Sequence, residues 1–125
     1  MEIILITNNY KVYKKYRDHI DITYDQNFTY LEILEYTRDK IHQGHELLTH
    51  PLSGSIKPNE TPYKSILISK KRNGLDFNSL SIIEESIKTT EKFLNDKITP
   101  NWTDKVLEDF KVIDLSLIEN VIDSL

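Results

Sequence analysis

The chain has 125 residues, of which 38% are hydrophobic and 29% are charged, and its formal net charge is −4. This composition predicts a single globular domain over residues 1–125, and it excludes a disordered or fibrous protein. The chain contains no cysteine, which excludes disulfides, thiolate catalysis and Cys-based zinc sites, and a negative charge without a basic stripe argues against a nucleic-acid partner.

The N-terminal residues predict a strand followed by a helix. Residues 3–6 form a continuous apolar run, which favours a strand that is covered on both faces. Asn9 can cap the helix that follows, because its side-chain oxygen can accept a hydrogen bond from the first helical turn. Val12 and Tyr16 then recur four residues apart, so one narrow face of this helix is apolar.

A second strand and a second helix are expected next. Residues 20–24 alternate between apolar and polar, the period of a half-buried strand near a sheet edge. Thr29 and Glu32 have the spacing of a capping box, which predicts a helix start. Gly44 predicts the end of this helix, since a left-handed residue after the last turn costs glycine little.

The order of the elements predicts an α/β fold. The remaining elements are expected to be strands at 47–48 and 65–69, a long helix capped by Asp76, a break at 95–100, a short helix capped near Thr103, and a last helix starting at a Ser116–Glu119 capping box. We expect a three-layer sandwich with a mostly parallel four-stranded sheet, Rossmann- or flavodoxin-like, on which residues 101–125 pack as a C-terminal helical extension. The direction of the strand at 65–69 is open, since a helix-free loop permits a wide hairpin or a crossover.

The connection at 51–64 is the most informative stretch, because it holds three of the four prolines. Long connections without secondary structure are uncommon in compact domains unless they bind something. In an open parallel sheet, ligands lie outside the carboxyl ends of the strands, so we expect this loop to fold over that rim. The predicted ligand-binding residues are Thr7, Asn8, Asn9, His50, Ser53, Gly54, Ser55, Lys57, Asn59, Glu60 and Tyr63.

Two features of the loop permit alternative interpretations. Ser53, Gly54 and Ser55 could present backbone amides as an anion nest, or form a tight turn with local serine–backbone bonds. His50 could be a general acid or base, the one catalytic candidate, or its ring could only stiffen the loop. The sequence lacks the G-x-x-x-x-G-K-[ST] and G-x-G-x-x-G patterns, so the expected ligand is a small carboxylate or anion and not a nucleotide.

No metal or cofactor is expected. The spacing of His42, His45 and His50 matches no known ligand pattern. No stretch approaches the ~18 consecutive apolar residues of a membrane span, and the first residues do not resemble a secretory signal. We therefore expect a cytoplasmic protein without a membrane partner.

The loop sequence THPLSGSIKPNETPYKSI, together with TNN after the first strand, resembles the GrdX family. These are small proteins encoded beside the glycine, sarcosine and betaine reductases of amino-acid-fermenting anaerobes. The resemblance covers the chain to about residue 95 and implies no catalytic residues. Tyr10 stands where proline is expected in many relatives, which changes only how the first helix starts.

Three functions are therefore considered. The first is a non-catalytic accessory or small-ligand-binding protein, associated by resemblance with amino-acid reductases and with a possible protein partner in such a complex. The second is a protein-interaction module that acts through the acidic C-terminal helices. The third is a small enzyme of hydrolase or isomerase type that uses His50.

Overall fold

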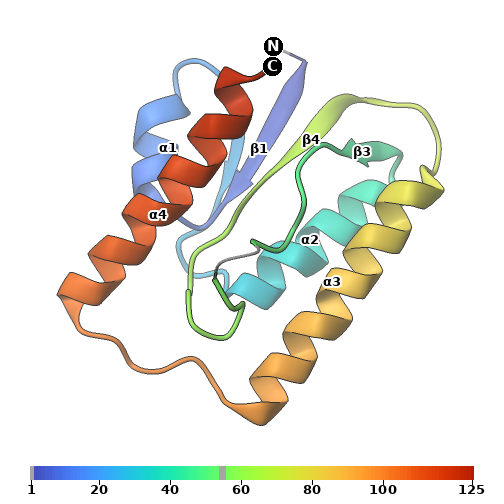
Figure 1. Ribbon diagram of the computed structural model, residues 1–125. Coiled ribbons are helices and arrows are strands. Elements are labelled where there is room, and N and C mark those ends of the chain that lie inside the picture. Colours follow the sequence, from blue (N-terminus) through green and yellow to red (C-terminus); the bar gives the residue numbers. More distant parts are fainter. Residues whose placement is uncertain (1, 54–55) are drawn as a thin grey trace.

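Strands and helices alternate along the chain until the third strand, as Figure 1 shows. The computed structural model describes residues 2–53 and 56–125. In chain order the elements are β1 (Ile3–Thr7), α1 (Tyr10–Tyr16), β2 (Asp21–Tyr24), α2 (Tyr30–His42), β3 (His45–Leu47), β4 (Ser65–Arg72), α3 (Phe77–Asp96) and α4 (Asp104–Asp123).

The sheet is mixed, in the order β2-β1-β4-β3. Strands β1 and β2 are parallel, whereas β4 is antiparallel to both β1 and β3. The expected α/β fold with a four-stranded sheet is confirmed, but the sheet is mixed: β1, β2 and β3 run in one direction, and β4, whose direction the sequence leaves open, runs in the other. In its described part, the connection from β3 to β4 contains no helix, and β4 runs antiparallel to β3, so of the two alternatives the structure has the wide hairpin. The Rossmann- or flavodoxin-like assignment stays a prediction.

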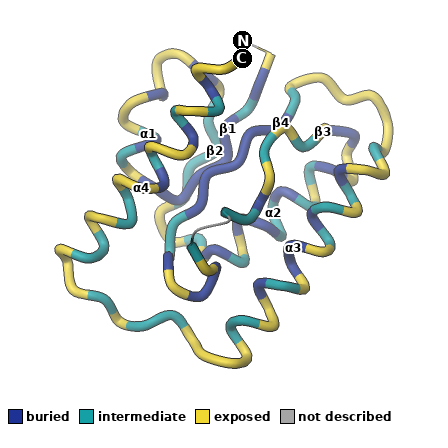
Figure 2. The backbone as a smooth tube through the Cα atoms, in the orientation of Figure 1, coloured by how far each residue is buried: buried dark blue, intermediate teal, exposed yellow. Residues whose placement is uncertain are grey.

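The two faces of the sheet are covered by different helices, which makes three layers (Figure 1). On one face, the core with α2 and α3 consists of Ile6, Tyr30, Ile33, Leu34, Ile41, Ile66, Ile68, Ile83 and Ile87. On the other face, the core with α1 and α4 consists of Ile3, Leu5, Val12, Tyr16, Ile20, Leu67, Ile118 and Ile122. Burial is concentrated in β1 and β4, whose central positions in the sheet remove both faces from water (Figure 2).

Local signals placed several helix ends correctly. Asn9 caps α1 and Asp76 caps α3, each through its side chain. Thr29 and Glu32 form the complete capping box of α2, and Gly44 follows that helix with a φ of +103°. Such a φ favours glycine, because a Cβ would crowd the backbone there.

The expected pair of C-terminal helices is wrong, because a single helix, α4, runs from Asp104 to Asp123. Thr103 caps it as expected, by accepting a hydrogen bond from the backbone N–H of Val106. Ser116 and Glu119, expected to be a capping box, lie in the helix interior. No proline or glycine interrupts this segment, and packing of Ile118 against the sheet favours an unbroken helix.

None of the helices in the described residues is long and apolar enough to cross a membrane.

Candidate functional site

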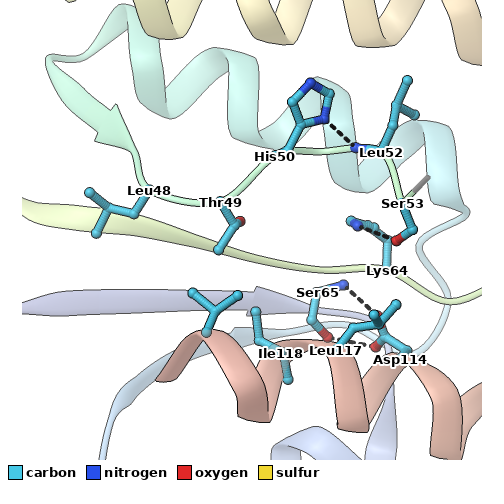
Figure 3. A pocket seen from close by; sticks show the side chains of 11 residues that line it. Leu48, Thr49, His50, Leu52, Ser53, Lys64, Ser65, Asp114, Leu117 and Ile118 are labelled. Carbon is cyan, nitrogen blue, oxygen red and sulfur yellow. Dashed lines mark hydrogen bonds between the residues drawn. The ribbon is translucent and has the colours of Figure 1, made fainter. Parts of the chain in front are cut away.

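A cavity of about 350 Å³ lies at the carboxyl rim of β1 and β3, where β4 begins (Figure 3). Both strands run in the same direction because each is antiparallel to β4, so the expected shared rim exists. The polar wall of the cavity is formed by Thr49, His50, Ser53, Lys64, Ser65 and Asp114. Its apolar wall includes Leu117, Ile118 and Val121 of α4.

Lys64 brings a buried amine to this cavity. The residue is 6% exposed, and its Nζ donates a long hydrogen bond of 3.4 Å to Ser53 Oγ. Its Nζ also lies 5.9 Å from the centre of the Tyr30 ring. Among the described residues, no carboxylate approaches this amine within the 4.0 Å of an ion pair. Burial lowers the pKa of Lys64, and the negative charge of Asp114 acts in the opposite direction.

Asp114 brings a buried carboxyl group to the same cavity from α4. It is 6% exposed, and its Oδ1 accepts a hydrogen bond from the backbone N–H of Ser65 at 3.1 Å. Its Oδ2 accepts from Ser65 Oγ at 2.7 Å and from Asn9 Nδ2 at 3.0 Å. Burial raises the pKa of Asp114, while the hydrogen bonds from Asn9 and Ser65 and the charge of Lys64 lower it.

Thr7 and Asn9 support Asp114 from behind and do not line the cavity. The Ser65 hydroxyl has one hydrogen, which it donates to Asp114, so Thr7 Oγ1 is the donor in its 2.7 Å contact with Ser65 Oγ. Thr7 Oγ1 also accepts from the backbone N–H of Asn9 at 3.0 Å. These two predicted residues therefore position the site without facing a ligand.

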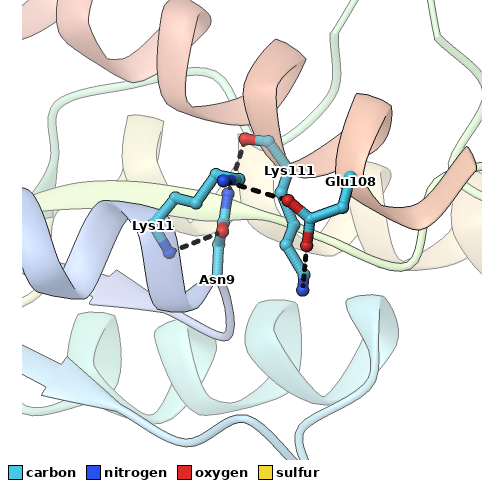
Figure 4. A network of polar contacts seen from close by, with 4 residues as sticks. All are labelled: Asn9, Lys11, Glu108 and Lys111. Atoms are coloured by element: carbon cyan, nitrogen blue, oxygen red, sulfur yellow. Dashed lines mark hydrogen bonds and ion pairs between the residues drawn. The ribbon is translucent and has the colours of Figure 1, made fainter. Parts of the chain in front are cut away.

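Asn9 also fastens α1 to α4, as Figure 4 shows. Its Oδ1 accepts from the backbone N–H of Lys11 at 3.1 Å, and its Nδ2 donates to the carbonyl of Lys111 at 2.9 Å. Glu108 pairs with Lys11 at 3.0 Å and with Lys111 at 3.1 Å. These surface ion pairs are solvated and contribute little to stability, so the buried amide contacts of Asn9 matter more.

Asn8 points away from the cavity and fixes the end of the loop. Its Nδ2 donates to the carbonyls of Phe28 and Pro62, both at 2.8 Å, and its Oδ1 accepts from the backbone N–H of Lys64 at 2.9 Å. Asn8 and Tyr63 line a separate cavity of about 380 Å³. The structure therefore does not bring Asn8 and Tyr63 together with His50.

His50 is exposed at the mouth of the cavity. Its Nδ1 accepts a hydrogen bond from the backbone N–H of Leu52 at 3.1 Å, and in Figure 3 its ring is directed away from Lys64 and Asp114. This contact ties the ring to the loop two residues ahead, and a role of the ring in stiffening the loop stays a prediction. A catalytic role for His50 stays a prediction. Among the residues that the structure describes, no group of three or more His, Asp or Glu side chains could hold a metal ion.

Ser53 is the one member of the predicted anion nest that the structure describes; Gly54 and Ser55 lie outside the described residues. Ser53 lines the cavity, and its Oγ accepts the hydrogen bond from Lys64. Ser53 and Ile56 face each other in an isolated antiparallel bridge. The nest therefore stays a prediction.

The other predicted loop residues lie beyond Ser53. Lys57 and Glu60 are exposed and line an adjoining cavity of about 570 Å³, which shares His50 and Ser53 with the first. Asn59 is buried, and its Nδ2 donates to the carbonyls of Phe93 and Lys97, which ties the loop to the end of α3. The carbonyl of Glu60 accepts a 2.7 Å hydrogen bond from Trp102 Nε1.

Sequence reasoning missed three residues of the site: Lys64, Ser65 and Asp114. Lys64 follows Tyr63, the last of the predicted ligand-binding residues, but the prediction does not include it. Asp114 lies four residues before Ile118, so it occupies the buried stripe of α4. A charged residue in an apolar helical stripe is a usable signal, but the expected interruption of this helix concealed it.

A buried amine and a buried carboxyl group on one small cavity form an electrostatically specific site. An anion in such a place interacts with the amine much more strongly than it would in water, because the surroundings have a low dielectric constant. The carboxyl group of Asp114 limits how much negative charge can enter.

A protein-family model described as GrdX-like protein matches residues 4–123, nearly the whole chain. No curated protein and no solved structure matches the chain.

Proposed function

This chain belongs to the GrdX-like protein family, and we propose that it is a non-catalytic accessory protein that binds a small carboxylate beside Lys64. The family resemblance suggests that it serves an amino-acid reductase system in the cytoplasm of an anaerobe. The ligand site is the cavity at the carboxyl rim, and its principal residues are Lys64, Ser53 and Asp114.

The buried amine of Lys64 is the observation that supports this proposal. An ammonium group has three donors, and within the described residues this one has a single long hydrogen bond. A charge that is buried without a partner is costly, so a bound anion would stabilise the ammonium form. A competing explanation is that Lys64 only balances Asp114. It is less favourable, because no contact within 4.0 Å joins the two groups.

The surroundings of the amine favour a small monoanion. The cavity of about 350 Å³ has an apolar wall along α4, which suits the hydrocarbon part of a short carboxylic acid. The hydroxyl of Thr49 accepts from the backbone N–H of Leu67 at 3.1 Å and keeps its own hydrogen for a ligand oxygen. Asp114 repels a dianion, so a carboxylate should bind better than phosphate.

Ligand-induced stabilisation tests the proposal. We expect acetate, propionate or glycine to raise the thermal midpoint of the native protein. At 100 times its Kd, such a ligand should increase the free energy of unfolding by about 2.7 kcal/mol. Lys64→Met should remove this effect. Lys71→Met is the matched control, because Lys71 is an exposed lysine on the same strand. The proposal is wrong if no small anion stabilises the native protein, or if folded Lys64→Met is stabilised equally.

A further inference from the structure

The Lys64 amine lies where its neutral form is favoured. The side chain is buried beside the Tyr30 ring, and within the described residues its amine donates to a hydroxyl and not to a carboxylate. Lysines that are desolvated in this way act as nucleophiles and form Schiff bases. Burial lowers the pKa of Lys64, which increases the share of amine that carries a free electron pair at neutral pH.

Groups that can move protons adjoin this amine. The Ser53 hydroxyl is in contact with Nζ, and Asp114 lines the same cavity. Burial raises the pKa of Asp114, so its carboxyl group can hold a proton at a higher pH than an exposed one. A nucleophile and a proton donor that line the same cavity are the groups that carbonyl addition requires.

We propose that Lys64 Nζ forms a covalent imine with a small 2-oxo acid held in the cavity. The inference rests on the proposed function, since the carboxylate of the 2-oxo acid is the anion that the site attracts. In a 2-oxo acid the carbonyl carbon is bonded directly to the carboxylate carbon. The ammonium form of Lys64 attracts the carboxylate. Once it releases its proton to solvent, the neutral amine has the reactive carbon within reach.

The reaction consumes one amine and one carbonyl group and releases one water. The nitrogen electron pair forms a bond to the carbonyl carbon, and the electron pair of the C=O bond moves to the oxygen, which takes a proton from the Asp114 carboxyl group. The nitrogen then loses a proton to the Asp114 carboxylate. The Asp114 carboxyl group then protonates the hydroxyl, which leaves as water while the nitrogen electron pair forms the C=N bond. The products are a protonated imine, one water and the Asp114 carboxylate, and no group is oxidised or reduced.

Reductive trapping of the native protein tests the imine. Full-length protein is incubated with glyoxylate or pyruvate and sodium cyanoborohydride, digested, and mapped by mass spectrometry. We expect a carboxymethyl group from glyoxylate, or a carboxyethyl group from pyruvate, on Lys64. It should form there faster than on exposed lysines such as Lys71, since burial lowers the pKa of Lys64 and leaves more of its amine neutral.

Three controls separate the imine from simple anion binding. Acetate has the carboxylate without a reactive carbonyl group, and acetaldehyde has the carbonyl group without the carboxylate, so only the 2-oxo acids should label Lys64 rapidly at low concentration. Lys64→Arg keeps a cation but cannot form the imine, so it should keep the stabilisation by acetate and lose the adduct.

The outcomes distinguish the two proposals. Labelling spread over exposed lysines, with Lys64 unmodified and acetate binding intact, would overturn the imine and leave the proposed function standing. Loss of both acetate stabilisation and Lys64 labelling in the native protein would overturn both. Selective labelling of Lys64 that acetate suppresses by competition would support both.

Discussion

Asn9 Nδ2 donates a hydrogen bond to Asp114 Oδ2 at 3.0 Å, across 105 positions of sequence. This contact joins the end of β1 to the middle of α4, and Ser65 adds two hydrogen bonds from the start of β4. The carboxyl group that holds α4 on the sheet is therefore also part of the cavity wall. Stability and ligand binding should respond together when this group changes.

Replacing Asp114 should destabilise the fold. In Asp114→Ala, the buried backbone N–H of Ser65 loses its acceptor, and we expect a loss of about 3 kcal/mol in the free energy of unfolding. Asp109→Ala is the matched control on the same helix, since Asp109 is exposed, and it should stay within about 0.5 kcal/mol. Urea unfolding followed by circular dichroism measures both. Equal losses in the two variants would contradict the role of Asp114.

The raised pKa of Asp114 makes its contribution to stability depend on pH. The folded protein keeps this proton at pH values where the unfolded chain, with a pKa of 3.8, has lost it. The resulting stabilisation is complete below pH 3.8 and is lost as the pH rises through the folded pKa. Relative to Asp114→Asn, the native protein should therefore lose stability as the pH rises. Urea unfolding of both proteins from pH 3.8 to neutrality checks this, and a constant or growing difference would refute it.

Asn8 should be as important for stability as a core residue, because its buried side chain satisfies one buried and two partly buried backbone groups. We expect Asn8→Ala to cost about 3 kcal/mol in the free energy of unfolding. Asn8→Asp keeps the acceptor for the Lys64 N–H but loses both donors, so it should also be strongly destabilising. Asn27→Ala, at an exposed position, is the control. If Asn27→Ala and Asn8→Ala unfold at the same urea concentration, Asn8 does not hold the loop in place.

The capping residues could be predicted from sequence because their chemistry is local. Asn9, Thr29 and Asp76 each accept from a backbone N–H two or three residues ahead, whatever the rest of the chain does. The direction of β4 is not local. It depends on whether the loop crosses the sheet or returns to the same rim, and no residue within the strand determines which of the two occurs.

The candidate site, like the fold, could be predicted from sequence only in part. The directions of β1 and β3 place Thr7 and His50 on one rim, and this inference holds. Thr7 and Asn9 support the cavity beside Asp114. The side chain of Asn8, which lies between them in sequence, points to a different cavity, because successive side chains of an extended segment alternate. Asp114 reaches the site only through the packing of α4, which a local pattern does not specify.

Two substitutions test directly whether residues 104–123 form one unbroken helix. Thr103→Ala removes a helix cap and should cost about 1 kcal/mol in the free energy of unfolding. Ser116→Ala places a better helix former at an exposed interior position and should be neutral or stabilising by up to about 0.5 kcal/mol. Thermal and urea unfolding of the two variants measure both changes in the free energy of unfolding. If Ser116 capped a separate helix, its replacement would cost as much as that of Thr103.

Lys64 should make the protein more stable as the pH rises. The unfolded chain holds the lysine proton up to pH 10.5, whereas the folded protein releases it earlier because burial lowers the pKa. The unfolded state thus binds more protons between these two values, and stability rises with pH there, by about 1.4 kcal/mol for each unit by which the pKa is lowered.

Lys64→Met lacks this proton equilibrium and keeps an apolar chain of similar length, so it isolates the effect. Asp114 on α4 and Tyr30 on α2 face the amine in both proteins, and their own titration largely cancels in the comparison. The difference in unfolding free energy between the native protein and Lys64→Met, measured in urea from pH 7 to pH 10.5, should shift steadily in favour of the native protein. Lys71→Met, which replaces an exposed lysine on the same strand, is the control. A flat profile for Lys64→Met would mean that the amine stays charged in the fold, and the imine chemistry would lose its nucleophile.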